Sequence, residues 1–97
     1  MEFSDTLVLQ AASKQVSNPL PEGVVILSLS NGVYYTLNEV GALIWQHLQQ
    51  PQTIAMLREV ILAEYNISPE QSQADLAAFI TKLLEARLVE VVCDQSG

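Results

Sequence analysis

The segment that most constrains the fold runs from residue 24 to residue 48, where two β-prone runs meet at Asn31-Gly32 and lead directly into a helical pattern. Residues 24–29 read VVILSL and residues 33–37 read VYYTL, and both runs are rich in β-branched and aromatic side chains. An Asn-Gly pair between such runs indicates a two-residue hairpin, because both residues tolerate the positive φ angles of a type I′ turn. We therefore predict that these two runs are antiparallel neighbours.

Two further strands are predicted outside this hairpin, at residues 6–11 and 88–93. They read TLVLQA and LVEVVC, which are short runs that a sheet can accept. Between the first strand and the hairpin, residues 17–23 read SNPLPEG, in which two prolines and a glycine interrupt regular structure. If the first three strands form a simple meander, the strand at 33–37 lies at the edge of the sheet with one side unpaired.

Three helices are predicted after the hairpin, each with a recognisable capping residue. Asn38, Thr53 and Ser68 can each accept a hydrogen bond from a free N–H group in the first helical turn. Ser68 is followed by proline at the first helical position and by glutamine three residues on, which completes a start pattern. Gly41 leaves room for a neighbouring group to approach the first helix closely. A three-stranded antiparallel sheet followed by three helices gives an α+β, winged helix-turn-helix-like fold, which we expect to form a single domain over residues 1–97.

Charge separates this chain from DNA-binding proteins of that architecture. Four basic residues stand against eleven acidic ones, which gives a formal charge of -7. Such a surface repels a phosphate backbone, and the third helix, which would read the DNA, offers only Lys82 and Arg87 as cations. We therefore expect no nucleic-acid binding, and we keep a winged-helix transcriptional regulator as an alternative hypothesis.

The sequence predicts a cytoplasmic protein without a membrane segment. Its longest apolar run is far shorter than the ~18 residues that a membrane helix requires. The amino-terminal segment MEFSDTLVLQ carries acids where a secretory signal has Lys or Arg. Cys93 is the only cysteine and cannot form an internal disulfide, which fits a reducing compartment.

No catalytic or metal-binding motif is recognisable. His47 has no second histidine or cysteine at ligand spacing, so we interpret it as a surface or boundary residue. Nucleophile elbows, Walker loops and dinucleotide-binding glycine patterns do not occur. Cys93 lacks a basic neighbour that would lower its pKa, and we expect it to be inert. The expectation is a protein without enzymatic activity, metal or cofactor.

The third helix carries an aromatic residue at the margin of its apolar face. The residues that can face the core are Leu76, Ile80, Leu83 and Leu84, and those on the neighbouring stripe are Asp75, Phe79, Lys82 and Ala86. In one interpretation Phe79 only completes the core. In the other, a groove lies between this helix and the free strand edge. Phe79 and Ala86 form its floor, and Asp75 and Lys82 lie at its rim. An extended peptide can then pair with residues 33–37 as an added strand.

Two adjacent tyrosines distinguish the edge strand. Tyr34 and Thr36 face one side of the strand, and Val33, Tyr35 and Leu37 face the other. Large side chains on both faces stiffen an edge while its backbone stays available. The competing interpretation is an ordinary hairpin that packs both tyrosines and hides its edge. An open edge can also pair with a second copy, so a weak homodimer is a further expectation.

Several motifs in a fixed order resemble the PqqD-like proteins, the peptide-recognition elements of ribosomal peptide biosynthesis. The resemblance covers about residues 20–92. Its features are a G-x-Y-Y-x-L-N-E-x-G-x-x-I-W segment, a Thr-Ile helix start after Pro51, an E-Y-x-I-x-P-E linker and a D-x-x-x-F-I-x-x-L-x-x-x-x-L-V ending. The small stand-alone members that this chain most resembles are the leader-binding proteins of lasso-peptide pathways.

The resemblance implies a function and a set of contact residues. It implies capture of a precursor's leader peptide as a strand added to the third strand of the sheet, followed by transfer to a separate leader peptidase. A PqqD-type peptide chaperone for a radical-enzyme pathway is the alternative within the family. The implied pairing strand contains Val33, Tyr34, Tyr35 and Thr36, and the implied helical wall contains Asp75, Phe79, Lys82 and Leu83.

Overall fold

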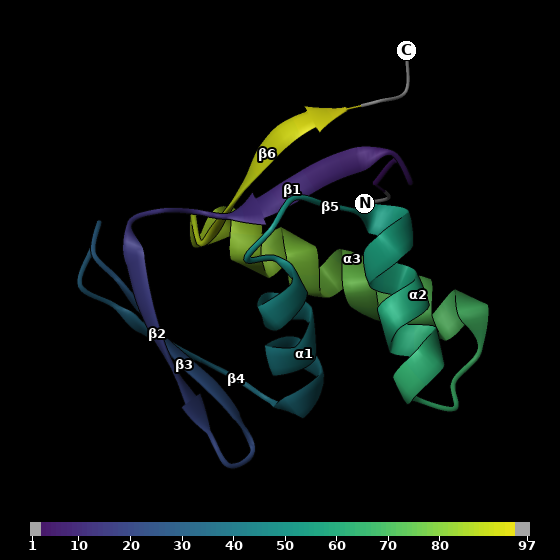
Figure 1. The fold of residues 1–97 in the computed structure, drawn as a ribbon, viewed down its shortest axis with the longest axis horizontal. Coiled ribbons are helices and arrows are strands. Elements are labelled where there is room, and N and C mark those ends of the chain that lie inside the picture. The colour runs from purple at the N-terminus through teal and green to yellow at the C-terminus, as the bar shows by residue number, and fades with distance from the viewer. Residues whose placement is uncertain (1–2, 95–97) are drawn as a thin grey trace.

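The computed structural model describes residues 3–94 and arranges them as two three-stranded antiparallel sheets and three helices (Figure 1). In chain order the elements are β1 (Leu7–Ala11), β2 (Gln15–Leu20), β3 (Gly23–Ser28), β4 (Tyr34–Leu37), α1 (Glu39–His47), β5 (Gln52–Thr53), α2 (Ile54–Glu64), α3 (Pro69–Glu85) and β6 (Val89–Asp94). One sheet has the strand order β2-β3-β4 and the other β5-β1-β6. The α+β fold class is confirmed, and the second sheet is an addition to it.

The first predicted strand forms, but it does not join the hairpin. β1 pairs antiparallel with β5 on one side and with β6 on the other. The predicted terminal strand is confirmed as β6, and it brings the two ends of the described chain together (Figure 1). The predicted meander is therefore wrong in its first strand, because residues 7–11 pair with strands from far along the sequence and β2 takes their place beside β3.

The third strand of the hairpin sheet is β2, in a segment that was predicted to be irregular. Leu29 N–H donates to Lys14 O at 3.0 Å, which fixes which residue pairs of β2 and β3 are hydrogen-bonded. Bonded and non-bonded pairs alternate along an antiparallel ladder, so the backbone of Pro19 faces away from β3. Proline is tolerated on an edge strand in this orientation, because its missing N–H has no partner to lose. The loop prediction for residues 17–23 is therefore correct only for the turn at residues 21 and 22, because Gly23 begins β3.

The hairpin between β3 and β4 is confirmed, but its turn is longer than predicted. Ser28 N–H donates to Val33 O at 3.0 Å and Gly32 N–H donates to Ser28 O at 2.9 Å, so residues 29–32 form the connection. Gly32 has a φ of 71°, whereas Asn31 is not among the described residues with positive φ, which excludes a type I′ turn. Asn31 Oδ1 instead accepts from Val33 N–H at 2.9 Å.

The three helix starts are confirmed by their capping bonds. Asn38 Oδ1 accepts from Gly41 N–H at 2.9 Å, and the hydroxyls of Thr53 and Ser68 each accept from a first-turn N–H at 3.1 Å. The end of α3 has Arg87 in the left-handed region, with a φ of 59°, where glycine is the usual residue. This turn directs the chain from α3 into β6.

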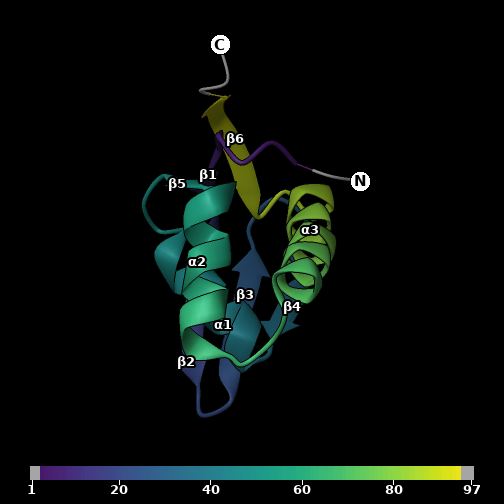
Figure 2. The same cartoon turned by 90° about the vertical axis from the view of Figure 1, so that its right-hand side faces the viewer.

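The core lies between the three helices and the inner faces of both sheets, and Figure 2 shows α2 and α3 side by side in front of α1 and the hairpin sheet. Its fully buried apolar side chains are Leu9, Ile26, Ile44, Leu48, Leu57, Ile80 and Leu88. On α3 three of the four residues predicted to face the core, Leu76, Ile80 and Leu83, are buried, and the fourth, Leu84, is partly buried against the core. Within residues 3–94, no helix has the length and apolar character needed to cross a membrane.

Candidate functional site

The outer side of β4 is an unpaired strand edge within residues 3–94, since β4 closes one end of the β2-β3-β4 sheet. The bond from Ser28 N–H to Val33 O fixes the alternation of the β3–β4 ladder, so Tyr35 and Leu37 bond to β3. The backbone N–H and C=O groups of Tyr34 and Thr36 therefore point away from β3. They are the groups that an added strand can bind.

The side chains of β4 divide between the two faces of the sheet. Tyr34 is 68% exposed and Thr36 is exposed, whereas Tyr35 and Leu37 pack against the core. The predicted alternation is confirmed, and the interpretation in which the hairpin packs both tyrosines is wrong. Val33 precedes the strand and is 45% exposed, with both of its backbone groups already engaged in the hairpin loop.

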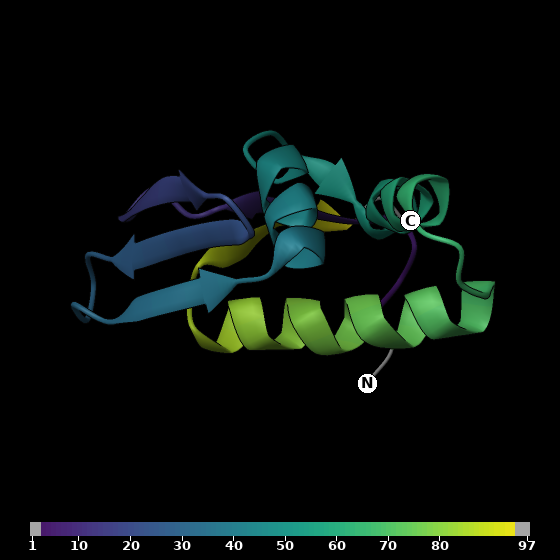
Figure 3. The ribbon, with the colours of Figure 1, turned by 90° about the horizontal axis from the view of Figure 1, so that it is seen from below.

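A cavity of about 230 Å³ lies where β4 leads into α1. It is lined by Asn38, Val40, Gly41 and Ile44 from the start of α1, by Ile61 from α2, and by Asp75, Leu76 and Phe79 from α3. Figure 3 shows β4 passing directly into α1 above α3. Two of the four predicted helical-wall residues, Asp75 and Phe79, are thus brought to the end of the open strand.

Phe79 is held in place by the close approach of α1. A Cβ added at Gly41 would lie 3.1 Å from Cε1 of Phe79, so the aromatic ring lies directly against the glycine. Phe79 is partly buried and packs on the core, which leaves part of the ring to line the cavity. Asp75 is exposed and accepts a hydrogen bond from Gln71 Nε2 at 2.8 Å.

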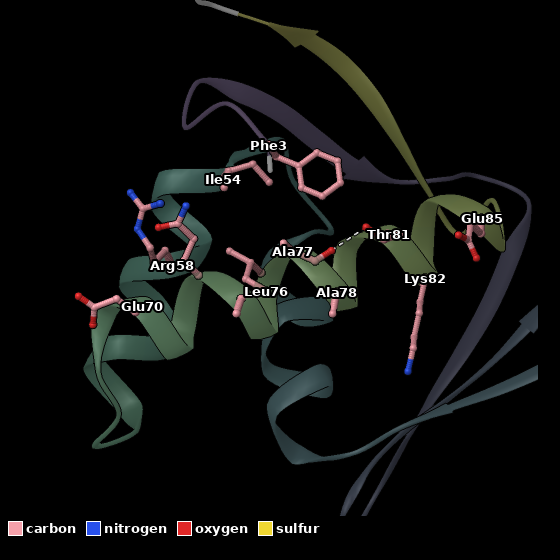
Figure 4. Close-up of a pocket in the computed structure, with 12 residues that line it drawn as sticks. Phe3, Ile54, Arg58, Glu70, Leu76, Ala77, Ala78, Thr81, Lys82 and Glu85 are labelled. Atoms are coloured by element: carbon pink, nitrogen blue, oxygen red, sulfur yellow. Dashed lines mark hydrogen bonds between the residues drawn. The ribbon is translucent and has the colours of Figure 1, made fainter. Parts of the chain in front are cut away.

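The other two predicted wall residues lie elsewhere. Leu83 is only 2% exposed and belongs to the core, and it does not line the cavity. Lys82 is exposed and lines a different cavity of about 790 Å³ on α3, where Figure 4 shows it extending away from the ring of Phe3. The sequence interpretation missed Val40 and Gly41 as cavity residues, although the absence of a linker between β4 and α1 could have indicated them.

An ion pair at the edge of this larger cavity holds the amino-terminal segment on α2. Arg58 donates through both terminal nitrogens to the two carboxylate oxygens of Asp5, each at 2.8 Å (Figure 4 shows Arg58). The hydrogen bond from Arg58 lowers the pKa of Asp5 from its ordinary value, and the same bond raises the pKa of Arg58. Within the described part of the chain, no group of three or more His, Cys, Asp or Glu residues could hold a metal ion.

Comparison with known proteins gives a family model and two solved structures. The model described as coenzyme PQQ synthesis protein D (PqqD) matches residues 23–89. TbiB1 in complex with the TbiA(beta) leader peptide is 29% identical, with a TM-score of 0.79, and the alignment covers 88% of this chain and 99% of that chain. No curated protein matches the sequence.

The second structure is a lasso peptide synthetase B1 complexed with the leader peptide. It is 26% identical to this chain, with a TM-score of 0.74, and the alignment covers 84% of this chain and 96% of that chain. Both structures therefore match over nearly their whole length.

Proposed function

This chain belongs to the PqqD family, and on that premise we propose that it binds the leader peptide of a ribosomally synthesised precursor as a strand added to β4. The observation that carries the proposal is the open edge of β4, where the backbone groups of Tyr34 and Thr36 face outward beside a cavity lined by Phe79. Strand addition obtains affinity from backbone bonds and selectivity from a pocket for a side chain. The open edge of β4 can supply the backbone bonds, and the cavity lined by Phe79 can supply the pocket.

The size of the site sets the expected affinity. Two outward residues offer two N–H and two C=O groups, and a cavity of about 230 Å³ can hold one apolar side chain of the guest. After the cost of ordering the peptide, we expect a binding free energy of about -8 kcal/mol, which corresponds to a dissociation constant near micromolar. Such an affinity suits transient capture and release.

The pathway is proposed from the two similar structures. Each is described as a complex with a leader peptide, and one is described as a lasso peptide synthetase B1. We propose that this chain serves a lasso-peptide pathway in the cytoplasm, that it acts by binding and not by catalysis, and that it delivers the leader to a separate leader peptidase. The description of the matching family model favours a second candidate, a peptide chaperone in a radical-enzyme pathway.

Amide hydrogen exchange with a synthetic lasso leader tests the proposal residue by residue. We expect the N–H groups of Tyr34 and Thr36 to become protected when the leader binds, because they gain acceptors. The outward N–H groups of Gln15 and Ser17 on β2 are the internal control and should not change. Protection on β2, or none on β4 at saturating leader, contradicts the proposal. Protection by a radical-enzyme precursor leader alone supports the second candidate.

A further inference from the structure

The side of α1 that faces away from Phe79 lines a cavity of its own, about 600 Å³ in volume. This α1–α2 cavity lies between the turn of β2 and β3, α1, and the end of α2. Its apolar lining includes Pro19, Leu20, Leu43, Trp45 and Tyr65. None of its lining residues also lines the cavity beside β4. A bound leader and an occupant of this second cavity can therefore be present together, with α1 between them.

The α1–α2 cavity is lined by two carboxylates and by no basic side chain among the described residues. Glu39 and Glu64 lie at the rim, and none of the described residues lining it is Lys or Arg. Glu64 is the last residue of α2, where the helix dipole already places negative charge, and the last turn has no basic residue. Within residues 3–94, the detected ion pair is elsewhere, between Asp5 and Arg58. A Lys or Arg from another molecule could pair with these carboxylates.

Trp45 supplies an independent indication of a ligand. Its side chain lines the cavity and is only 3% exposed, yet its indole Nε1–H has no hydrogen-bond partner among the described residues. Buried donors of this kind are nearly always paired in folded proteins. A carbonyl of a bound ligand that reaches this donor would satisfy it.

We propose that the α1–α2 cavity docks an extended basic segment of the leader peptidase. An apolar side chain of that segment packs against Leu20 and Leu43, a carbonyl accepts from Trp45 Nε1, and a Lys or Arg lies between Glu39 and Glu64. A second copy of this chain is a poor occupant, because its net charge is -7. The inference rests on the proposed function for the identity of the partner, and it adds the place where that partner binds.

A matched pair of charge reversals tests the inference. Glu64→Lys changes the last residue of α2, and Glu85→Lys makes the same change at the last residue of α3, outside the cavity. Both place a cation at a helix C-terminus, so both should keep the fold. Binding of the purified pathway peptidase to the leader-loaded protein should weaken about tenfold with Glu64→Lys and change less than about twofold with Glu85→Lys.

Leader affinity is measured on the same variants and separates this inference from the proposed function. Unchanged leader affinity with weakened peptidase binding supports it. An equal loss of peptidase affinity in both variants, or no loss of peptidase affinity in Glu64→Lys, overturns the inference and leaves the proposed leader binding intact. Absence of peptidase binding to the wild-type protein also overturns it. A wild-type protein that does not bind the leader at all instead refutes the proposed function.

A spectroscopic probe reports on the cavity itself. Trp45 is the only tryptophan in the chain, so 5-fluorotryptophan labels this position alone. Its fluorine resonance should shift when the unlabelled peptidase is added near the wild-type dissociation constant, and it should shift much less in the Glu64→Lys variant at the same concentration. If the resonance does not change when the peptidase is added, or shifts equally in both proteins, the contact lies elsewhere and the proposed docking in the α1–α2 cavity is overturned.

Discussion

The two edges of the β2-β3-β4 sheet share one central strand but differ in what they offer to another chain. On β2 the backbone positions that face outward belong to Gln15, Ser17 and Pro19, and the last of these has no N–H to donate. On β4 the outward positions belong to Tyr34 and Thr36, and each of these residues has both an N–H and a C=O group. The sheet thus has one edge interrupted by proline and one that can accept a full strand.

This difference makes β4, and not β2, the edge to which another strand can readily be added. Natural sheets commonly protect exposed edges with proline or charge, because an open edge pairs with any available strand. Here the protection is applied to β2, while β4 lies beside the cavity that contains Asp75 and Phe79. An added strand on β4 would lie next to the cavity that Phe79 lines, whereas Pro19 and Leu20 of β2 line the separate α1–α2 cavity. The asymmetry therefore favours one docking edge over the other.

The sharpest test of the asymmetry moves the proline from one edge to the other. Thr36→Pro removes an outward N–H from β4 and should weaken leader binding by about 2–3 kcal/mol, or about 30- to 150-fold, because a leader carbonyl is left unpaired against the ring. Calorimetry measures the affinity. The fold should survive, since an edge strand tolerates proline when the lost N–H faces outward.

Ser17→Pro is the matched control on β2, because Ser17 also faces outward. Its leader affinity should stay within about twofold of wild type. Equal losses in Thr36→Pro and Ser17→Pro would show that the proline acts through general destabilisation, and the edge model would then fail. Tyr35→Pro is unsuitable for this comparison, because the N–H of Tyr35 faces β3 and its loss would damage the sheet itself.

The cavity beside β4 is the second difference between the edges, and Phe79→Ala tests it. Removing the ring takes away part of the apolar surface that lines the cavity, so we expect leader affinity to fall about tenfold, or about 1.4 kcal/mol. Calorimetry measures the affinity, and thermal unfolding measures the accompanying loss of stability.

Leu84→Ala is the control for Phe79→Ala. Leu84 is also partly buried on α3, but it lines none of the three cavities described. This variant should lose stability without losing leader affinity. If both variants reduce leader affinity equally, the effect belongs to α3 as a whole and the cavity is not the anchor site.

The contrast between the edges also explains what the sequence could predict. The helix starts at Asn38, Thr53 and Ser68 and the pairing of β3 with β4 were predicted correctly, because capping bonds and hairpins join residues that are close in sequence. β2 was missed because Pro19 interrupts a local strand pattern, and only its position on the outer side of the sheet makes it acceptable. The partners of β1 were missed because they lie more than 40 residues away in sequence.

The same distinction, between features set by nearby residues and contacts between distant ones, applies to the candidate site. Exposure of Tyr34 and Thr36 follows from the period of a strand, and the position of Phe79 at the margin of the apolar face follows from the period of a helix. The contact between Phe79 and Gly41 joins α3 to α1, so the sequence indicated a close approach to the glycine without identifying its partner. The family resemblance implied that Lys82 and Leu83 are wall residues, whereas in the structure Lys82 lines another cavity and Leu83 is buried in the core.

Restoring the missing donor on β2 should produce the smallest effect. Pro19→Thr gives the outer side of β2 an N–H at every residue, so we expect a modest increase in self-association at high concentration, measured by sedimentation velocity. Leader affinity should change by less than about twofold, because β4 is untouched. In the wild-type protein the complete edge is β4, so any weak dimer should dissociate when the leader is added. If Pro19→Thr sediments as the wild-type protein does, with and without leader, then Pro19 is not what keeps the β2 edge closed, and the asymmetry must come from the cavity beside β4 alone.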